Sequence, residues 1–380
     1  MPCLVGSELP VYSRLPVVAA RGEGCTIWDR EGRAYLDLYG GHAVAALGYG
    51  HAGWTQTVVS HLESLQFQTN ALHLDVRDEA IQALAAVAPP GLNNVFLVNS
   101  GAEANENALR MAFWHTGRSK VVCLEGGFHG RTAASGAVTD GSEKWFGFPR
   151  APFDVERISP GDVRSLDAAL TPDTAAFLFE PVQGVAGGLD LDPEFVKTAT
   201  SLCRERGILM VADEVQTGIG RTGTMFCVEQ SGVTPDLLTS AKGLGNGFPV
   251  AAVLCNSALA AHAKPGMLGT TFGGGPMACA AILAVLNEVN APGFLEGVRS
   301  RATYLRETCL RAGVPRVTGR GFLLGLHLGT PAAPVRQALL TKGFLTGDAR
   351  DPNVVRLLPP LILSHAEIES FGAALGEVLA

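Results

Sequence analysis

Apolar residues in the middle of the chain form short unbroken runs. The runs at 94–98, 121–124 and 208–212 are almost wholly apolar, which is typical of parallel strands covered on both faces. Segments with apolar residues at helical spacing lie between such runs, and this alternation predicts a layered α/β domain. The predicted strands are 93–100, 120–126, 175–181 and 208–214, and the predicted helices are 103–117, 193–207 and 275–290.

The pattern changes after about residue 288. An amphipathic helix is predicted over 297–313, followed by short strands within 319–329 and 353–363 that are interrupted by glycine and proline. Near the start of the chain, 24–41 reads as a β-hairpin that belongs with this region. We therefore expect a large domain over 46–287 and a smaller α+β domain made of 1–45 and 288–380.

Composition narrows the class of protein. Of the 380 residues 47% are hydrophobic and 17% charged, which favours a well-buried globular protein. The net charge of −7 gives no indication of nucleic-acid binding. The N-terminus "MPCLVGSELPVYSRLP" lacks the apolar core of a signal peptide, and no run of 18 apolar residues could span a membrane. We expect a soluble cytoplasmic protein.

Cysteine and histidine spacing gives no indication of metal binding or of disulfides. The eight cysteines are scattered without a C-x-x-C pair, which favours a reducing compartment. The nine histidines form no H-E-x-x-H or similar cluster. We therefore expect no metal site.

Lys242 stands in an unusual stretch of sequence. Between Asp236 and Lys264 it is the only formally charged side chain. Such a lysine is paired across space, reaches up to water, or is not an ammonium at all. A desolvated setting with few charges lowers the pKa of a lysine, which is what an amine that forms a Schiff base requires.

The stretch "VNSGAEANENALRMA" carries a possible phosphate site. Ser100 and Glu103 have the spacing of a capping box, and Gly101 allows a tight turn from strand to helix. The same geometry presents free N–H groups and the positive end of a helix dipole to an anion. On these residues alone, helix capping and phosphate binding are equally good readings.

Asp213 lies at the end of the predicted strand 208–214, where ligands bind in open α/β sheets. It could instead cap the following loop. The spacing of Gly218, Gly220 and Gly223 matches G-x-G-x-x-G, but no obvious nucleotide-binding helix follows, so we reject a dinucleotide site. A Schiff-base lysine, a carboxylate and a phosphate cradle together are what pyridoxal phosphate uses, although a buried structural lysine stays possible.

Six motifs occur in order along the chain: "NSGAEANENAL", "FHGRTAAS", "EPVQG", "ADEVQTGIGRTG", "SAKGLGNGFP" and "GTTFGGGP". They resemble the signature series of the class III aminotransferases, which are pyridoxal-phosphate enzymes of fold type I. The resemblance runs from about residue 24 to "VVRLLPPLILS" and implies a large domain with a mostly parallel seven-stranded sheet flanked by helices, plus a smaller α+β domain. "YLDLYGGHAV", "GTTFGG" and "RLLPPL" look most like the acetylornithine aminotransferase group, which includes members acting on N-succinylornithine.

The resemblance implies a role for each matching residue. Lys242 would form the Schiff base and shuttle a proton, and Asp213 would pair with the pyridine nitrogen. Arg356 would bind the carboxylate next to the reacting carbon of glutamate or 2-oxoglutarate, and Arg131 the far carboxylate, since guanidinium groups grip carboxylates bidentately. Either arginine could instead form a surface ion pair. The remaining cofactor residues would be Gln216 near the phenolic oxygen, Phe128 on the ring face unless it is ordinary core packing, Ser100, Gly101 and Ala102 at the phosphate, and Thr271 at the phosphate from the neighbouring subunit of a homodimer.

The implied reaction moves the δ-amino group of an N-acylornithine to 2-oxoglutarate and yields glutamate, as in arginine biosynthesis. Alternatives are ω-aminotransferases acting on free ornithine, 4-aminobutyrate or an acylated lysine precursor, a mutase with the same cofactor, or a non-catalytic binding protein that has kept the fold.

Two positions depart from the family pattern. Many relatives have glutamate where this chain has Val185, and that acid neutralises the substrate arginine when an ω-amine donor is bound. With valine there, Arg356 must stay solvated, pair elsewhere or swing away. Gly275 replaces the usual asparagine of "TFGGN", for which we expect only a local loop effect.

Overall fold

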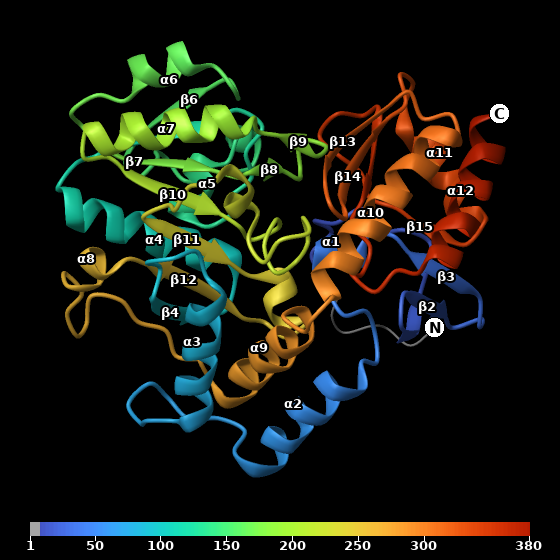
Figure 1. Ribbon diagram of the computed structural model, residues 1–380, viewed down its shortest axis with the longest axis horizontal. Helices are drawn as coiled ribbons and strands as arrows, with labels where there is room; N and C mark the ends of the chain where they lie inside the picture. Colours follow the sequence, from blue (N-terminus) through green and yellow to red (C-terminus); the bar gives the residue numbers. More distant parts are fainter. Residues whose placement is uncertain (1–7) are drawn as a thin grey trace.

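The computed structural model describes residues 8–380, and Figure 1 shows a larger lobe around one sheet beside a smaller lobe. The sheet of the larger lobe has seven strands in the order β4-β12-β11-β10-β7-β5-β6. The pairings of β7 with β5 and β10, of β5 with β6 and of β10 with β11 are parallel, and only β12 runs antiparallel to its neighbours. The expected mostly parallel sheet is confirmed. Its strands are β4 (Asn94–Val98), β5 (Lys120–Leu124), β6 (Asp154–Ile158), β7 (Thr174–Phe179), β10 (Leu209–Asp213), β11 (Leu237–Ser240) and β12 (Ala251–Cys255).

The unbroken apolar runs are explained by two cores, one on each face of the sheet. In β10, Met210 and Ala212 belong to one core, whereas Leu209 and Val211 belong to the other. Because successive side chains point to opposite faces, a strand covered on both sides must be apolar at every position.

The expectation that 94–98 forms a parallel strand covered on both faces was wrong. β4 lies at the edge of the sheet, pairs only with the antiparallel β12, and its first three residues are partly exposed. An apolar run does not distinguish a central strand from an edge strand whose outer side is also apolar.

Helices cover both faces of this sheet. α4 packs on β11 and β12 over one core, and α7 and α9 contribute to the other. The helices predicted over 103–117, 193–207, 275–290 and 297–313 correspond to α4, α7, α9 and α10. The helices are α1 (Gly40–Ala43), α2 (Ala52–Ser64), α3 (Asp75–Val87), α4 (Gly101–Thr116), α5 (Ala133–Val138), α6 (Val163–Ala169), α7 (Pro193–Glu205), α8 (Ser257–Ala260), α9 (Pro276–Val289), α10 (Phe294–Arg311), α11 (Ala332–Thr341) and α12 (His365–Leu379), with 3₁₀ turns η1 (Ser142–Lys144), η2 (Cys227–Ser231) and η3 (Lys242–Gly245).

The smaller lobe combines both ends of the chain. The predicted hairpin is present as β2 and β3, and β15 from near the C-terminus pairs with β3 in the sheet β1-β2-β3-β15. This pairing supports our proposal of a large domain over 46–287 and a small one made of 1–45 and 288–380, of which 1–7 lie outside the described residues. The strands of the chain outside the seven-stranded sheet are β1 (Ala19–Glu23), β2 (Thr26–Asp29), β3 (Ala34–Asp37), β8 (Val182–Gln183), β9 (Leu189–Asp190), β13 (Arg316–Arg320), β14 (Leu323–His327), β15 (Phe344–Leu345) and β16 (Val354–Leu357).

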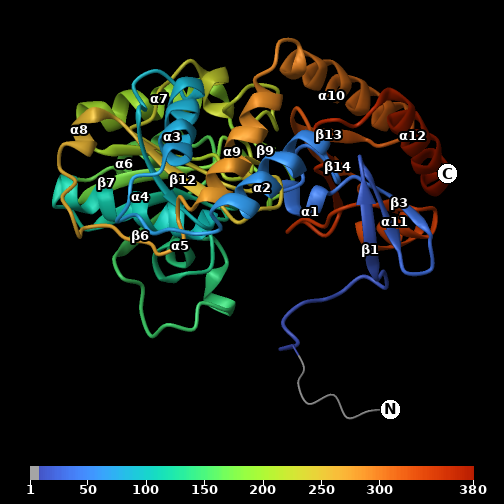
Figure 2. The same ribbon diagram turned by 90° about the horizontal axis from the view of Figure 1, so that it is seen from below.

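The segment before β1 extends away from the body of the molecule (Figure 2). Within 8–380, no single helix is long and apolar enough to cross a membrane. α9 and α10 reach that length and hydropathy only as a pair, which is bent by 71°.

Candidate cofactor and substrate site

Asp213 is the last residue of β10 and is buried. Its Oδ2 atom accepts hydrogen bonds from Asn105 Nδ2 and His129 Nδ1, both at 2.7 Å. Its Oδ1 atom accepts one good bond, from Val215 N at 3.0 Å, while Thr239 Oγ1 lies 3.5 Å away. Because a carboxylate oxygen has two lone pairs, Oδ1 keeps room for a further donor.

Lys242 follows the neighbouring strand β11 and opens η3 with a φ of +47°. This backbone conformation is uncommon for a residue with a side chain and concentrates at functional sites. Burial, and to a smaller extent the charge of Arg356, lowers the pKa of Lys242, while the carboxylates of Asp213 and Glu180 oppose the shift. The stretch thus holds an amine that loses its proton more readily than an ordinary lysine.

Ser100 caps the N-terminus of α4, and its hydroxyl accepts a hydrogen bond from Glu103 N at 3.2 Å. The expected capping box is only half present. The carboxylate of Glu103 accepts from the backbone N–H of Asn99, at 2.9 Å, and not from that of Ser100. The first turn of α4 is therefore tied back to the end of β4 through Asn99.

Gly101 has no room for a side chain. A Cβ atom there would lie 2.7 Å from Cγ1 of Val215. The glycine is required because the loop after β10 packs directly on the first turn of α4, which keeps that turn beside Asp213.

One cavity of about 340 Å³ brings these elements together. Lys242, Asp213 and the first turn of α4 all line it. Gln216, Thr271, Arg131 and Arg356 are not among its lining residues. The lining residues are Val44, Asn99, Ser100, Gly101, Ala102, Asn105, Phe128, His129, Gly130, Asp213, Val215, Ala241, Lys242, Gly247, Phe248, Pro249 and Val250.

Gln216 and Thr271 differ in their surroundings. Gln216 is buried, its Nε2 lies 3.4 Å from the carbonyl oxygen of His42, and its Oε1 has no partner among residues 8–380. Thr271 is exposed and is followed by Phe272, whose side chain is also exposed. Within one chain Thr271 therefore does not reach the cavity.

Arg131 is exposed, and its guanidinium lies over the rings of Trp145 and Phe128, with its carbon 4.5 and 5.9 Å from the ring centres. It forms no ion pair with the described part of the chain, so the alternative of a surface ion pair finds no partner. Phe128 is partly buried, and its N–H donates to Glu180 Oε1 at 2.8 Å.

Arg356 in β16 is buried. Its Nε donates to the carbonyl of Asp348, and its Nη2 donates to Tyr39 Oη at 2.9 Å. Nη1 has no partner among residues 8–380. The loop with Val185 lies nearby, since the carbonyl of Val185 accepts from Arg350 N at 2.9 Å. Of the alternatives left by Val185, the arginine thus pairs elsewhere, chiefly with uncharged oxygens.

Sequence reasoning missed Asn105, His129 and Glu180. The first two hold Asp213, and Glu180 accepts from Phe128 N and, at 3.4 Å, from Gly184 N. Burial raises the pKa of Glu180 to about 7. The available signal was their presence inside the quoted motifs "NSGAEANENAL", "FHGR" and "EPVQG".

The residues of the cavity fit pyridoxal phosphate. The N-terminus of the 16-residue helix α4 suits a phosphate, and Oδ1 of Asp213 has a lone pair for a ring N–H. Lys242 shares the cavity with both. Gln216 does not line this cavity, although its buried Oε1 is an acceptor without a partner among residues 8–380.

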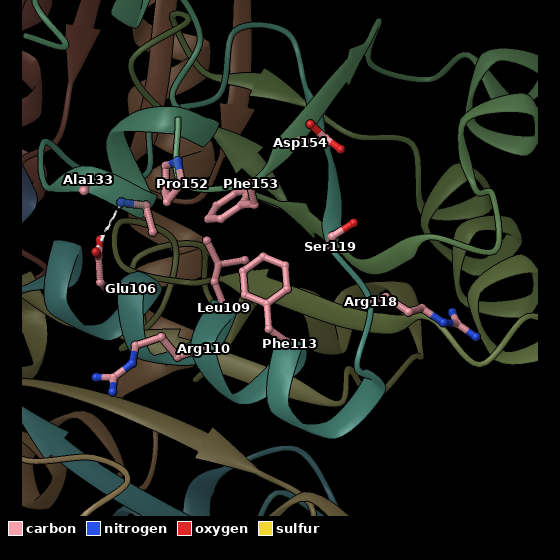
Figure 3. A pocket seen from close by; sticks show the side chains of 11 residues that line it. Glu106, Leu109, Arg110, Phe113, Arg118, Ser119, Ala133, Pro152, Phe153 and Asp154 are labelled. Carbon is pink, nitrogen blue, oxygen red and sulfur yellow. Dashed lines mark hydrogen bonds between the residues drawn. The ribbon is translucent and has the colours of Figure 1, made fainter. Parts of the chain in front are cut away.

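A larger cavity of about 470 Å³ lies beside α4 and α5. In Figure 3, Leu109, Phe113 and Phe153 point toward one another, and the guanidinium groups of Arg110 and Arg118 point away from them. The carboxylate of Glu106 is already bonded by backbone N–H groups of α5. This cavity therefore lacks converging polar groups that could do chemistry.

Comparisons with known proteins agree with this geometry. A family model described as aminotransferase class III matches residues 10–379. A curated acetylornithine aminotransferase from Listeria innocua is 37% identical over 97% of both chains, and one from Methanopyrus kandleri is 38% identical over 98% of this chain and 96% of its own. A solved ornithine aminotransferase from Toxoplasma gondii, with partial occupancy of PLP at its active site, has a TM-score of 0.92 at 29% identity and covers 98% of this chain and 91% of its own.

Proposed function

The chain belongs to the class III aminotransferases, and from that premise we propose that it transfers the δ-amino group of an N-acylornithine to 2-oxoglutarate, giving an acylated glutamate semialdehyde and glutamate. The cofactor is pyridoxal phosphate. The names of the curated relatives support an acylated ornithine as the donor, in a reaction of arginine biosynthesis.

One observation carries the proposal. An amine of lowered pKa, a buried carboxylate and the N-terminus of a long helix share a single cavity. A merely structural lysine would not require the other two groups beside it, whereas amino-group transfer requires all three.

Six lining residues of the cavity, together with Gln216, have a defined task in this proposal. The cofactor, when bound, supplies an electron sink for bond breaking at the substrate carbon. Lys242 would hold the cofactor covalently, and its Nζ atom, once free, would accept the proton from the substrate carbon. Oδ1 of Asp213 would accept a hydrogen bond from the ring nitrogen and would keep that nitrogen protonated. The N–H groups of Ser100, Gly101 and Ala102 would bind the phosphate. Phe128 would contact the ring face, and Gln216 would bind the phenolic oxygen.

The two arginines bind the carboxylates of the substrates. Arg356 binds the carboxylate next to the reacting carbon of glutamate or 2-oxoglutarate, and Arg131 binds the far carboxylate. In the other half-reaction Arg131 binds the α-carboxylate of the N-acylornithine. Acylation removes the charge of the α-amine and blocks cyclisation of the aldehyde product.

The active site in this proposal is shared by two chains. Thr271 reaches the phosphate of the partner subunit, which a homodimer makes possible. Support comes from the exposure of Thr271 together with that of Phe272, Phe67 and Leu72, since apolar side chains gathered at a surface mark contact sites.

A panel of amine donors tests the proposal. N-acetylornithine, N-succinylornithine, free ornithine and 4-aminobutyrate are each assayed with 2-oxoglutarate, and glutamate formation is measured. We expect the highest kcat/KM with one of the two acylated donors. The structural likeness to an ornithine aminotransferase makes free ornithine the second candidate, and a higher kcat/KM with ornithine than with both acylated donors would overturn our choice.

A further inference from the structure

The guanidinium of Arg356 is held without a close counter-charge. Its only carboxylate contact among the described residues is Asp348 Oδ1, 4.0 Å from Nη2, on a side chain that is 69% exposed. The closer partners are uncharged: the carbonyl of Asp348 and the phenol of Tyr39. Nη1 of this buried guanidinium has no partner among residues 8–380, which costs free energy unless a ligand accepts a hydrogen bond from it.

The backbone fixes the phenol of Tyr39 beside this guanidinium. Asp37 Oδ1 accepts from the N–H groups of Tyr39 and Gly40, at 2.8 and 2.9 Å, and Leu358 N donates to Leu38 O at 2.7 Å. These bonds join the end of β3 to the segment just after Arg356.

Gly347 leaves the space that the ring of Tyr39 occupies. A Cβ atom at Gly347 would lie 2.0 Å from Cε2 of that ring. Gly347 also exchanges two backbone hydrogen bonds with Arg356, each 2.9 Å long. The ring therefore packs on the residue that pairs with the arginine, and the arginine carbon lies 5.5 Å from the ring centre.

His42 orients the hydroxyl group of Tyr39. Its Nδ1 atom lies 2.6 Å from Tyr39 Oη. Since that oxygen accepts from Arg356, its own proton points to Nδ1, which makes the neutral Nδ1 atom of His42 the acceptor. Desolvation by the surrounding protein, followed by the charges of Arg356 and Lys242, lowers the pKa of His42, which favours the neutral form of the ring.

We propose that Tyr39, oriented by His42, is a positioning residue for Arg356 and does so in place of a carboxylate, so that the guanidinium stays fixed while its charge remains free for a dicarboxylate substrate. This rests on the proposed function, in which Arg356 binds the substrate carboxylate. Because no residue of 8–380 places a carboxylate closer than 4.0 Å to the guanidinium, its site selects ligands that bring their own carboxylate.

Binding of glutarate to the cofactor-loaded protein tests this inference by calorimetry, without any turnover. Glutarate has the two carboxylates of 2-oxoglutarate but no keto group to react. We expect the Kd of Tyr39→Phe to rise about ten-fold, the effect of one hydrogen bond to a charged group. His42→Leu removes the acceptor for Tyr39 and weakens binding, and His42→Gln, whose side-chain oxygen can accept, restores it. The matched control is Tyr35→Phe, which removes a phenol bonded to Asp29 at 3.0 Å on the same hairpin and leaves the Kd unchanged.

Steady-state kinetics separate positioning from a general loss of structure. In Tyr39→Phe the KM for 2-oxoglutarate rises while the kcat and the thermal midpoint stay close to those of the unchanged protein. Glutarate binding by Tyr39→Phe that is equal to or tighter than that of the unchanged protein would overturn the inference.

Arg356→Gln distinguishes failure of the inference from failure of the proposed function. If the unchanged protein binds glutarate and Arg356→Gln does not, the role of Arg356 stands whatever Tyr39→Phe does. If Arg356→Gln binds glutarate as well as the unchanged protein, the role of Arg356 fails, and the inference fails with it.

Discussion

His129 Nδ1 lies 2.7 Å from Asp213 Oδ2, and both side chains are almost fully buried. Asn105 Nδ2 bonds to the same oxygen, and Thr239 Oγ1 in turn donates to Asn105 Oδ1 at 2.7 Å. The carboxylate of Asp213 is thus fixed by two donors on Oδ2 and by Val215 N on Oδ1, and Oδ1 keeps a second lone pair for a ligand in the cavity. Buried networks of this kind hold a functional group in one orientation.

Asp213→Asn should abolish most of the activity. Removing one partner of a buried charge pair costs about 3–5 kcal/mol, so we expect kcat to fall by about 10²–10⁴-fold. Asp236→Asn is the matched control, because Asp236 is a half-buried aspartate at the opposite end of the neighbouring strand, where it accepts from Met210 N at 2.9 Å. An Asp213→Asn variant with a kcat like that of the control would contradict the role of Asp213.

Gly101→Ala should weaken cofactor binding. The added Cβ atom would lie 2.7 Å from Val215, and relieving such a contact costs about 1–3 kcal/mol and shifts the first turn of α4. We expect the Kd of the apoprotein for pyridoxal phosphate to rise about ten-fold or more, measured by fluorescence titration. Gly53→Ala in α2, where the nearest atoms are at 3.6 Å, should leave that Kd unchanged, and an unchanged Kd in Gly101→Ala would contradict the assignment of the phosphate site.

Val185→Glu should weaken the binding of 2-oxoglutarate. The loop with Val185 lies against the segment 347–350 that pairs with Arg356, so a carboxylate there competes with the substrate for the guanidinium. We expect the KM for 2-oxoglutarate to rise about ten-fold. The neutral variant Val185→Gln serves as control for side-chain size. Equal KM values in the two variants would show that the introduced charge does not reach Arg356.

Glu214 should make the stability depend on pH. The side chain is fully buried, its Oε1 accepts from Val228 N at 2.6 Å, and burial raises its pKa from 4.5 to about 7. The folded protein keeps this proton up to about pH 7, whereas the unfolded chain loses it near pH 4.5. The contribution to stability is therefore fully present below pH 4.5 and is lost as the pH rises to about 7, which amounts to about 3 kcal/mol.

Glu214→Gln removes this titration. The thermal midpoint of Glu214→Gln relative to that of the unchanged protein should rise by a few degrees between pH 5 and pH 8, as measured by calorimetry. The exposed substitution Glu205→Gln is the control and should show no such trend. A relative midpoint of Glu214→Gln that is constant over this range would contradict the predicted proton uptake.

The sequence predicted the parts of the fold that depend on local patterns. Apolar runs and helix caps located β10 with Asp213 at its end, and α4 with Ser100 at its cap, because strand ends and helix starts have local signals. The sequence did not show whether β4 is an edge strand or a central strand, since both kinds of strand can be apolar throughout.

Local sequence patterns could not predict the contacts between segments that lie far apart along the chain. Asn105 and His129 reach Asp213 from 108 and 84 residues away, and Tyr39 reaches Arg356 from 317 residues away. No periodicity relates such positions, so only the folded chain identifies them as partners. The half-formed capping box had a local cause that spacing did not reveal: Asn99 N, one residue before the cap, lies within reach of Glu103.

Identification of the lysine that carries the cofactor tests the central claim most directly. The holoenzyme is reduced with borohydride and digested, and the peptides are analysed by mass spectrometry. We predict a single pyridoxyl-modified residue, Lys242, and no modification in Lys242→Ala. Modification at another lysine, or undiminished modification in Lys242→Ala, would contradict the account.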